Sequence, residues 1–81
     1  MKAPDHARGE VSVVRAKLAV GRLRRDHCVG RVDVVLGEGI CHGCDRPIPH
    51  DEVEMRARFR DGDFLALHAR CFATWYTETQ R

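Results

Sequence analysis

Cys41-His42-Gly43-Cys44 is followed, after 23 intervening residues, by His68-Ala69-Arg70-Cys71 in this 81-residue chain. Each stretch holds two metal-ligand side chains with two residues between them, a spacing that lets both reach the same ion. Three thiols and one imidazole are a common ligand set of tetrahedral structural zinc sites. Four protein ligands leave no open position for water or substrate. The sequence therefore predicts one structural Zn²⁺, bound by Cys41, Cys44, His68 and Cys71.

Four cysteines in a short chain can instead form two disulfides. Disulfides persist in oxidising compartments, but residues 1–6 contain no apolar segment of a secretory signal. No apolar run is long enough to span a membrane. We therefore expect a cytoplasmic, reducing setting without membrane attachment. In that setting the cysteine spacing favours a metal over disulfides.

Three residues near the ligands have simpler interpretations. Cys28, outside both pairs, is expected to be a small half-buried apolar residue, with a reactive or intermolecular thiol as the alternative. His42 is expected to point outward from the surface, with contact to a partner as the alternative. Gly43 is expected to supply the positive φ that a tight turn between two ligands favours.

The C-terminal half shows a regular pattern around the ligands. Residues 53–59 alternate apolar and charged side chains, as a half-buried antiparallel strand requires. The dipeptide 61–62 is Asp-Gly, a hairpin turn that leads into a return strand over 64–67. Residues 68–79 are predicted to form a helix that directs three aromatic side chains into the core: Phe72, Trp75 and Tyr76. A stacking platform for nucleic-acid bases is the alternative role of these three rings.

The N-terminal half divides into three segments. Residues 1–9 are polar and are predicted to be disordered. Residues 10–25 are predicted to form an amphipathic helix whose apolar stripe is Val13, Ala16, Val20 and Leu23, widened by Val14 and Leu18. Residues 31–36 are predicted to form a strand with one apolar face: Val32, Val34 and Leu36. The helix and strand occupy 10–36, and the zinc-finger module occupies 37–81.

The pattern Cys41-x2-Cys44, Ile48, His68-x2-Cys71-Phe72 and Trp75 resembles two zinc-finger classes. One is the first half of a LIM domain, although this chain has no cysteine after Cys71 for a second site. The other is the DNA-break finger of poly(ADP-ribose) polymerases. The resemblance implies an α+β, zinc-stabilised, treble-clef-like finger, built from a zinc knuckle, a β-hairpin and a C-terminal helix, here preceded by an N-terminal helix.

A longer pattern is similar to a group of short, uncharacterised bacterial proteins. It runs through Lys17-Leu18-x2-Gly21-x-Leu23, Gly39-x-Cys41-x-Gly43-Cys44-Asp45-x-Pro47-Ile48 and Leu67-His68-x2-Cys71-Phe72-x2-Trp75. This resemblance implies the fold and the zinc site, and it implies no particular activity.

The charges are unevenly distributed. Residues 1–31 hold eight basic and three acidic residues, whereas 32–81 hold six and nine, so only the N-terminal part is basic. A basic cluster of this kind is either a solvated helix end or a phosphate-binding surface. Its members are Arg22, Arg24, Arg25 and Arg31.

The sequence contains no catalytic constellation: Ser12 is the single serine and has no base nearby in the pattern. We therefore expect a non-catalytic structural-zinc module that mediates protein–protein contacts. The alternative is a DNA-binding zinc finger that uses the basic N-terminal segment. A homo-oligomer formed through the apolar face of the helix over 10–25 is a further option.

Overall fold

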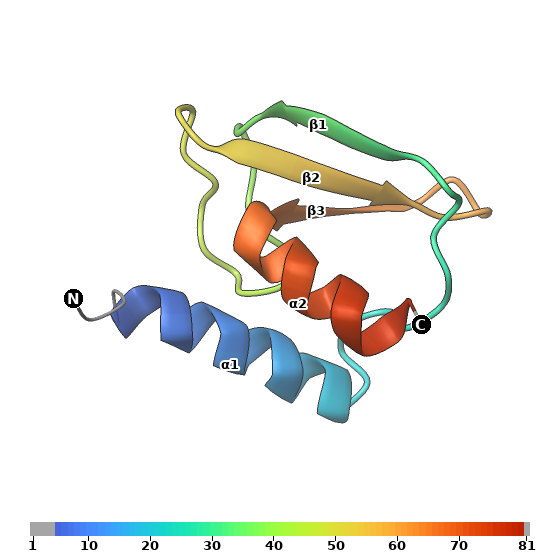
Figure 1. Ribbon diagram of the computed structural model, residues 1–81, viewed down its shortest axis with the longest axis horizontal. Coiled ribbons are helices and arrows are strands. Elements are labelled where there is room, and N and C mark those ends of the chain that lie inside the picture. The colour runs from blue at the N-terminus through green and yellow to red at the C-terminus, as the bar shows by residue number, and fades with distance from the viewer. Residues whose placement is uncertain (1–4, 81) are drawn as a thin grey trace.

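The computed structural model describes residues 5–80, and side chains from residue 9 onward (Figure 1). It confirms the α+β class, with two helices and a three-stranded antiparallel sheet in the order β1-β2-β3. The elements are α1 (Asp5–Ala19), β1 (Val32–Leu36), β2 (Val53–Arg58), β3 (Phe64–His68) and α2 (Ala69–Thr79). Neither helix in the described part is long and apolar enough to cross a bilayer.

The sheet, α2 and α1 form three successive layers (Figure 1). Ala57 of β2 lies opposite Val32 of β1 and Leu65 of β3. These three side chains therefore lie on the same face of the sheet, the one that α2 packs against. The Trp75 ring meets the Phe59 ring edge-on, with centroids 6.0 Å apart. The predicted strands and the C-terminal helix are confirmed to within one residue at each end. The strand β1 adds to the β2–β3 hairpin by pairing with β2. The sheet therefore joins the two predicted segments, 10–36 and 37–81.

The helix α1 begins and ends earlier than the sequence pattern predicts. Residues 5–9 belong to it, so their predicted disorder is wrong, while 1–4 lie outside the described residues. The helix ends at Ala19 rather than at residue 25 because Gly21, with φ of 77°, forms its C-terminal cap. Gly21 N donates to Leu18 O and Arg22 N to Lys17 O, the two bonds of a Schellman motif.

The buried face of α1 is also different from the predicted stripe. Val14 and Leu18 are buried, whereas Val13 and Ala16 are exposed and Val20 retains 69% of its accessible surface. The buried face also carries polar residues, Glu10 and Lys17, which have specific partners described below. The predicted stripe is therefore correct for Val14, Leu18 and Leu23, which are buried, and wrong for its other three residues.

The three aromatic residues predicted as core have different environments. Trp75 is fully buried, and its indole Nε1 donates a hydrogen bond to Arg24 O at 2.7 Å. Phe72 is partly buried against the core. Tyr76 is 46% exposed, which corrects the prediction for this residue, because it lies one step around α2 from Trp75, beyond the edge of the covered face.

Candidate metal centre

Four buried side chains converge at one point between the sheet and the helices. The Sγ atoms of Cys41, Cys44 and Cys71 and a ring nitrogen of His68 all lie within 4.8 Å of one another. The first pair sits in a tight turn, in which Asp45 N donates to Cys41 O at 2.8 Å. His68 is the last residue of β3 and Cys71 lies in the first turn of α2. The group could hold one metal ion, as the spacing predicts.

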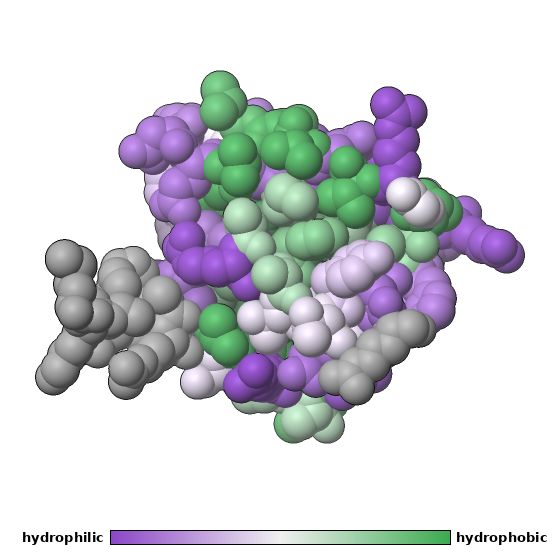
Figure 2. Space-filling model, viewed as in Figure 1, coloured by the Kyte–Doolittle hydropathy of each residue, from purple (hydrophilic) through white to green (hydrophobic). Residues whose placement is uncertain are grey.

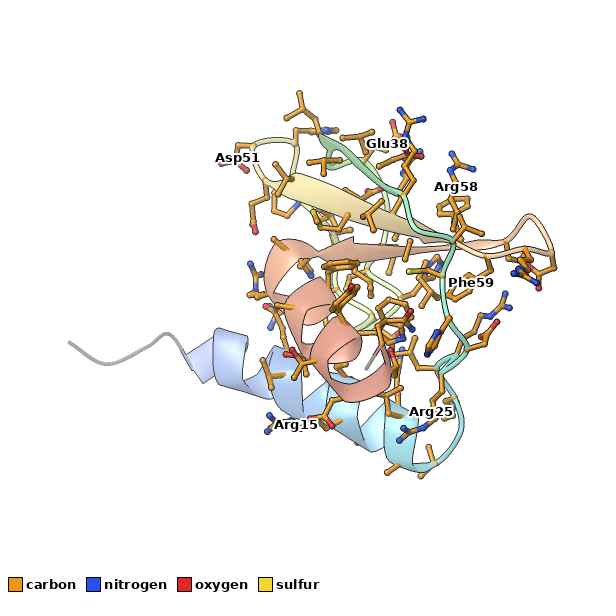
Figure 3. The ribbon with its side chains drawn as sticks, turned by 45° about the vertical axis from the view of Figure 1, so that its right-hand side comes forward. Arg15, Arg25, Glu38, Asp51, Arg58 and Phe59 are labelled. Atoms are coloured by element: carbon orange, nitrogen blue, oxygen red, sulfur yellow. The ribbon has the colours of Figure 1, made fainter. Side chains whose placement is uncertain are left out.

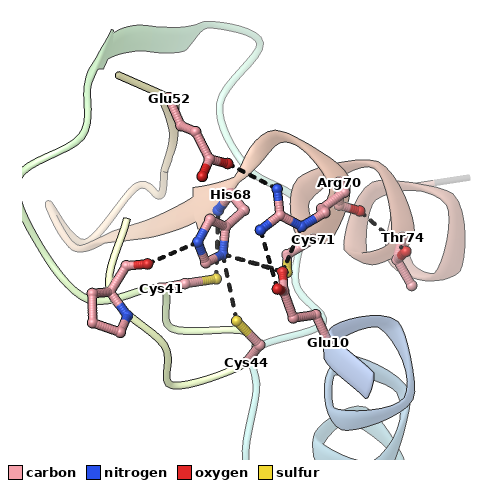
Figure 4. A network of polar contacts seen from close by, with 9 residues as sticks. Glu10, Cys41, Cys44, Glu52, His68, Arg70, Cys71 and Thr74 are labelled. Carbon is pink, nitrogen blue, oxygen red and sulfur yellow. Dashed lines mark hydrogen bonds and ion pairs between the residues drawn. The ribbon is translucent and has the colours of Figure 1, made fainter. Parts of the chain in front are cut away.

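The spacing of the donor atoms agrees with tetrahedral coordination. His68 Nδ1 is 3.4 Å from Cys44 Sγ and 3.8 Å from Cys71 Sγ (Figure 4). Usual zinc bond lengths place such atoms about 3.6 Å apart at the corners of a tetrahedron. The other ring nitrogen, Nε2, lies 3.0 Å from Pro47 O. With Nδ1 as the ligand, Nε2–H donates to this carbonyl, a contact that fixes the ring and its tautomer.

The three thiols differ in acidity. A hydrogen bond from the Cys71 thiol, together with the backbone N–H groups of His68, Cys44 and Gly43, lowers the pKa of Cys41 to about 4 despite its burial. Its contact with Cys41, together with burial, raises the pKa of Cys71. Burial raises the pKa of Cys44. A bound cation would therefore have to displace protons mainly from Cys44 and Cys71.

Glu10 brings α1 to the metal centre. Its carboxylate is buried, with Oε2 at 3.7 Å from His68 Nδ1 and 3.9 Å from Cys71 Sγ. Arg70 holds it through two hydrogen bonds, Nε to Oε2 at 2.5 Å and Nη2 to Oε1 at 3.1 Å (Figure 4). The remaining guanidinium nitrogen, Nη1, donates to Glu52 Oε1 at 2.8 Å. The Glu10 contact, with Glu52, raises the pKa of Arg70, so this cation stays charged.

Sequence reasoning missed Glu10 because its partner lies 60 residues away. The available signal was local to the second ligand pair, where Arg70 stands between His68 and Cys71. A guanidinium at that position can form a bidentate pair with a carboxylate from a distant part of the chain.

Lys17 forms a second link between α1 and the metal centre. Its ammonium group donates to His42 O at 2.8 Å and to Asp45 Oδ1 at 2.6 Å, which holds the turn that carries the first ligand pair. Asp45, and not Gly43, has the positive φ in this turn, at 66°. The conformational role predicted for Gly43 is therefore wrong, because the turn places the left-handed residue after the second cysteine.

Gly43 is needed for a different reason, the close approach of α1. A Cβ atom at Gly43 would lie 2.9 Å from Val14 Cγ2 and 3.0 Å from Leu67 Cδ2. Both distances are shorter than normal carbon–carbon contact, and both neighbours are buried. A residue without a side chain therefore lets α1, β3 and the metal-binding turn meet.

We expect Gly43→Ala to lower the free energy of unfolding by about 2 kcal/mol, through overpacking between Val14 and Leu67. The matched control is Gly39→Ala, since a Cβ at Gly39 would meet only Glu54 Oε1, at 3.8 Å. Urea denaturation of both variants measures the difference. Equal stability of the two variants would contradict the packing role of Gly43.

His42 is exposed, as predicted, but it also has a structural contact. Its backbone N donates to Ala66 O at 2.8 Å, and its Nδ1 accepts a hydrogen bond from Ala66 N at 2.9 Å. These bonds attach the metal-binding turn to the outer edge of β3. The alternating strand pattern could not indicate this contact. The backbone of β3 bonds here to His42, including its side chain, and not to a neighbouring strand.

The structure separates the four arginines of the predicted basic cluster. The Arg24 guanidinium lies 3.8 Å from the centroid of the Phe59 ring and forms ion pairs with Asp26 and Asp61. Arg25 lies beside the end of α1, where its Nη2 donates to Leu18 O at 3.3 Å (Figure 3). Both side chains therefore have structural partners, and three members of the cluster are exposed: Arg22, Arg25 and Arg31.

Cys28 lies outside the metal-binding group and is partly buried against the core. Its backbone N donates to Gln80 Oε1 at 3.0 Å, which ties the loop after α1 to the end of α2. This placement agrees with the predicted small half-buried residue.

Comparison with protein-family models, with curated proteins and with solved structures gave no match for this chain. The resemblances to LIM domains, to the DNA-break finger and to the short bacterial proteins therefore stay predictions. The assignment of the metal centre rests on geometry alone, namely four buried donor residues that could hold one ion.

Proposed function

We propose that the ion is zinc and that its role is structural. The observation that carries this proposal is the convergence of three cysteines and one histidine, all buried, with donor atoms within 4.8 Å of one another. Three thiolates and a neutral imidazole form a soft ligand set that suits Zn²⁺. In a chain this short, the free energy of metal binding contributes directly to folding.

We also propose a treble-clef-like arrangement for the module. The order of a metal-binding turn, the β2–β3 hairpin and α2 supports it, as does the location of the second ligand pair where β3 passes into α2. Thiolate ligands in this role require a reducing compartment, which in turn supports the predicted cytoplasmic setting.

We propose that the protein is not an enzyme. Four protein ligands complete a tetrahedral zinc site, and catalytic zinc sites keep a position for water or substrate. Glu10, a further carboxylate in contact with the ligand group, is held by Arg70 in a bidentate pair. The contacts of the site thus hold α1, the sheet and α2 together.

The exposed surface supports a function in protein–protein contact. Val34, Leu36 and Val53 expose 56%, 70% and 42% of their surface. They lie on the face of the sheet that α2 covers only in part, and Figure 2 shows apolar residues gathered there. Contiguous exposed apolar side chains on a small protein mark an interaction surface.

DNA binding, the second candidate, has weaker support. Arg56 and Arg58 on the other face of the sheet are paired with Glu54 and Asp33, respectively, and Arg24 is similarly paired. Phosphate binding would therefore depend on the exposed Arg22, Arg25 and Arg31. If DNA is the ligand, affinity for a duplex should fall steeply with salt, and Ala at all three positions should reduce that slope.

Metal analysis by native mass spectrometry tests the proposal directly. Protein prepared without chelator should carry one zinc ion and lack the corresponding thiol protons. Replacement of zinc by Co²⁺ should give the visible absorption of a tetrahedral thiolate site. A folded protein without metal, or one lighter by the hydrogens of a disulfide, would overturn the structural-zinc role.

A further inference from the structure

The outer edge of β1 is an unusual feature of a protein this small. β1 is the first strand of the sheet, and no other strand in residues 5–80 pairs with its outer side. Its sequence is Val-Asp-Val-Val-Leu, with one charged residue and no proline. Proteins usually protect exposed edges with lysine, proline or bulges, because an open edge is a template for another strand.

The hydrogen-bonding pattern shows which backbone groups are directed outward. Gly37 N donates to Glu52 O at 2.9 Å, in register with the β1–β2 ladder. Antiparallel strands alternate between bonded and non-bonded pairs, so Asp33 and Val35 also direct their backbone groups toward β2. The groups that point to the outer edge therefore belong to Val32, Val34 and Leu36.

These same three residues form the apolar face of β1. They lie opposite Ala57, Met55 and Val53, on the side of the sheet that faces α2. Yet α2 contacts β2 and β3, and among the described elements β1 has contacts with β2 alone. The apolar side chains and the unpaired backbone groups of β1 thus occur at the same positions.

We propose that the outer edge of β1 pairs antiparallel with β1 of a second copy of this chain, giving a two-fold dimer with a continuous six-stranded sheet. This inference rests on the proposed protein-contact function and specifies its surface and partner. In the pairing centred on Val34, that residue faces its own counterpart and Val32 faces Leu36 of the second copy. This register uses all the outward-directed backbone groups of both strands.

The charges of β1 and its flanks fit this register. Asp33, the one charge within the strand, lies opposite Val35 of the second copy, so the two acidic groups do not meet. Its carboxylate is also neutralised within the chain by Arg58, at 2.7 Å. Arg31 lies opposite Gly37 and next to Glu38 of the second copy, and both charged side chains are exposed.

The two flanking charges also belong to the same face of the joined sheet. Arg31 precedes Asp33 by two residues and so shares its face, opposite the apolar residues. Glu38 is directed to that face by its bond to Arg56, at 2.9 Å. Two-fold symmetry places one Arg31–Glu38 pair at each end of the junction, where opposite charges favour this register.

The test is the mass of the metal-loaded protein in solution, measured by light scattering during size-exclusion chromatography. The wild type is expected to have the mass of a dimer. Val34→Lys, which sets two ammonium groups against each other at the two-fold axis, is expected to halve that mass. Val20→Lys is the matched control, because Val20 is 69% exposed but follows α1, which among the described elements does not contact β1, and this variant should stay dimeric.

A charge exchange tests the register. Arg31→Glu and Glu38→Arg should each weaken the dimer, and the double variant should restore it. A metal-loaded wild-type protein that is monomeric overturns the dimer, while the structural-zinc proposal stands. A dimer lost in Val20→Lys but retained in Val34→Lys also overturns edge pairing. Loss of metal in the wild type would instead contradict the structural-zinc role.

Discussion

Cys44→Ser is expected to remove the metal and to unfold the sheet and α2 together. A serine hydroxyl does not replace a thiolate as a zinc ligand, and the binding free energy of a structural zinc site is on the order of 10 kcal/mol at neutral pH. That amount equals or exceeds the whole stability of a typical small domain. Circular dichroism of the variant, and of the wild type with excess chelator, should show the same loss of structure.

The control for this prediction is Cys28→Ser, which removes the cysteine outside the metal-binding group. Because Cys28 is only partly buried, this change should keep the metal and the fold, with a cost of about 1 kcal/mol. If Cys44→Ser kept its sheet and helices without metal, the core alone would stabilise the fold. If Cys28→Ser also lost the metal, the ligand group would be incorrectly assigned.

The metal-binding group and the strand beside it were predictable because their sequence signals are local. The ligand pairs and the alternation of 53–59 are patterns within a few residues, and short-range geometry links them to structure. The same holds for the apolar face of β1, which the register confirms. What the pattern could not show is that this face lies at the edge of the sheet, beyond the reach of α2.

The errors in the buried face of α1 have a common physical cause. Its orientation depends on polar contacts with distant residues: Glu10 with Arg70, and Lys17 with the metal-binding turn. A polar residue that is buried with a specific partner has the same appearance in a sequence as a solvated one. The end of α1 had a local signal, Gly21, whose left-handed conformation supplies the cap.

The link between α1 and the metal centre leads to the second large expected effect, that of Arg70→Met. Glu10 is only 3% exposed, and the substitution removes its bidentate cation. Breaking a buried ion pair from one side costs about 3 kcal/mol or more, since a desolvated charge remains. That charge would lie 3.9 Å from Cys71 Sγ, so it should also weaken metal binding by repelling the thiolates.

Two comparisons distinguish this mechanism from a general loss of stability. Arg15→Met removes an exposed ion pair with Glu78, 3.5 Å long, and should change the free energy of unfolding by less than about 1 kcal/mol. The double variant Glu10→Gln with Arg70→Met should recover part of the loss, because no charge is then left buried. Urea denaturation and competition with a chelator measure stability and metal affinity. If Arg70→Met behaved like Arg15→Met in both, the Glu10 carboxylate would be solvated rather than buried, and α1 would dock through Val14, Leu18 and Lys17 alone.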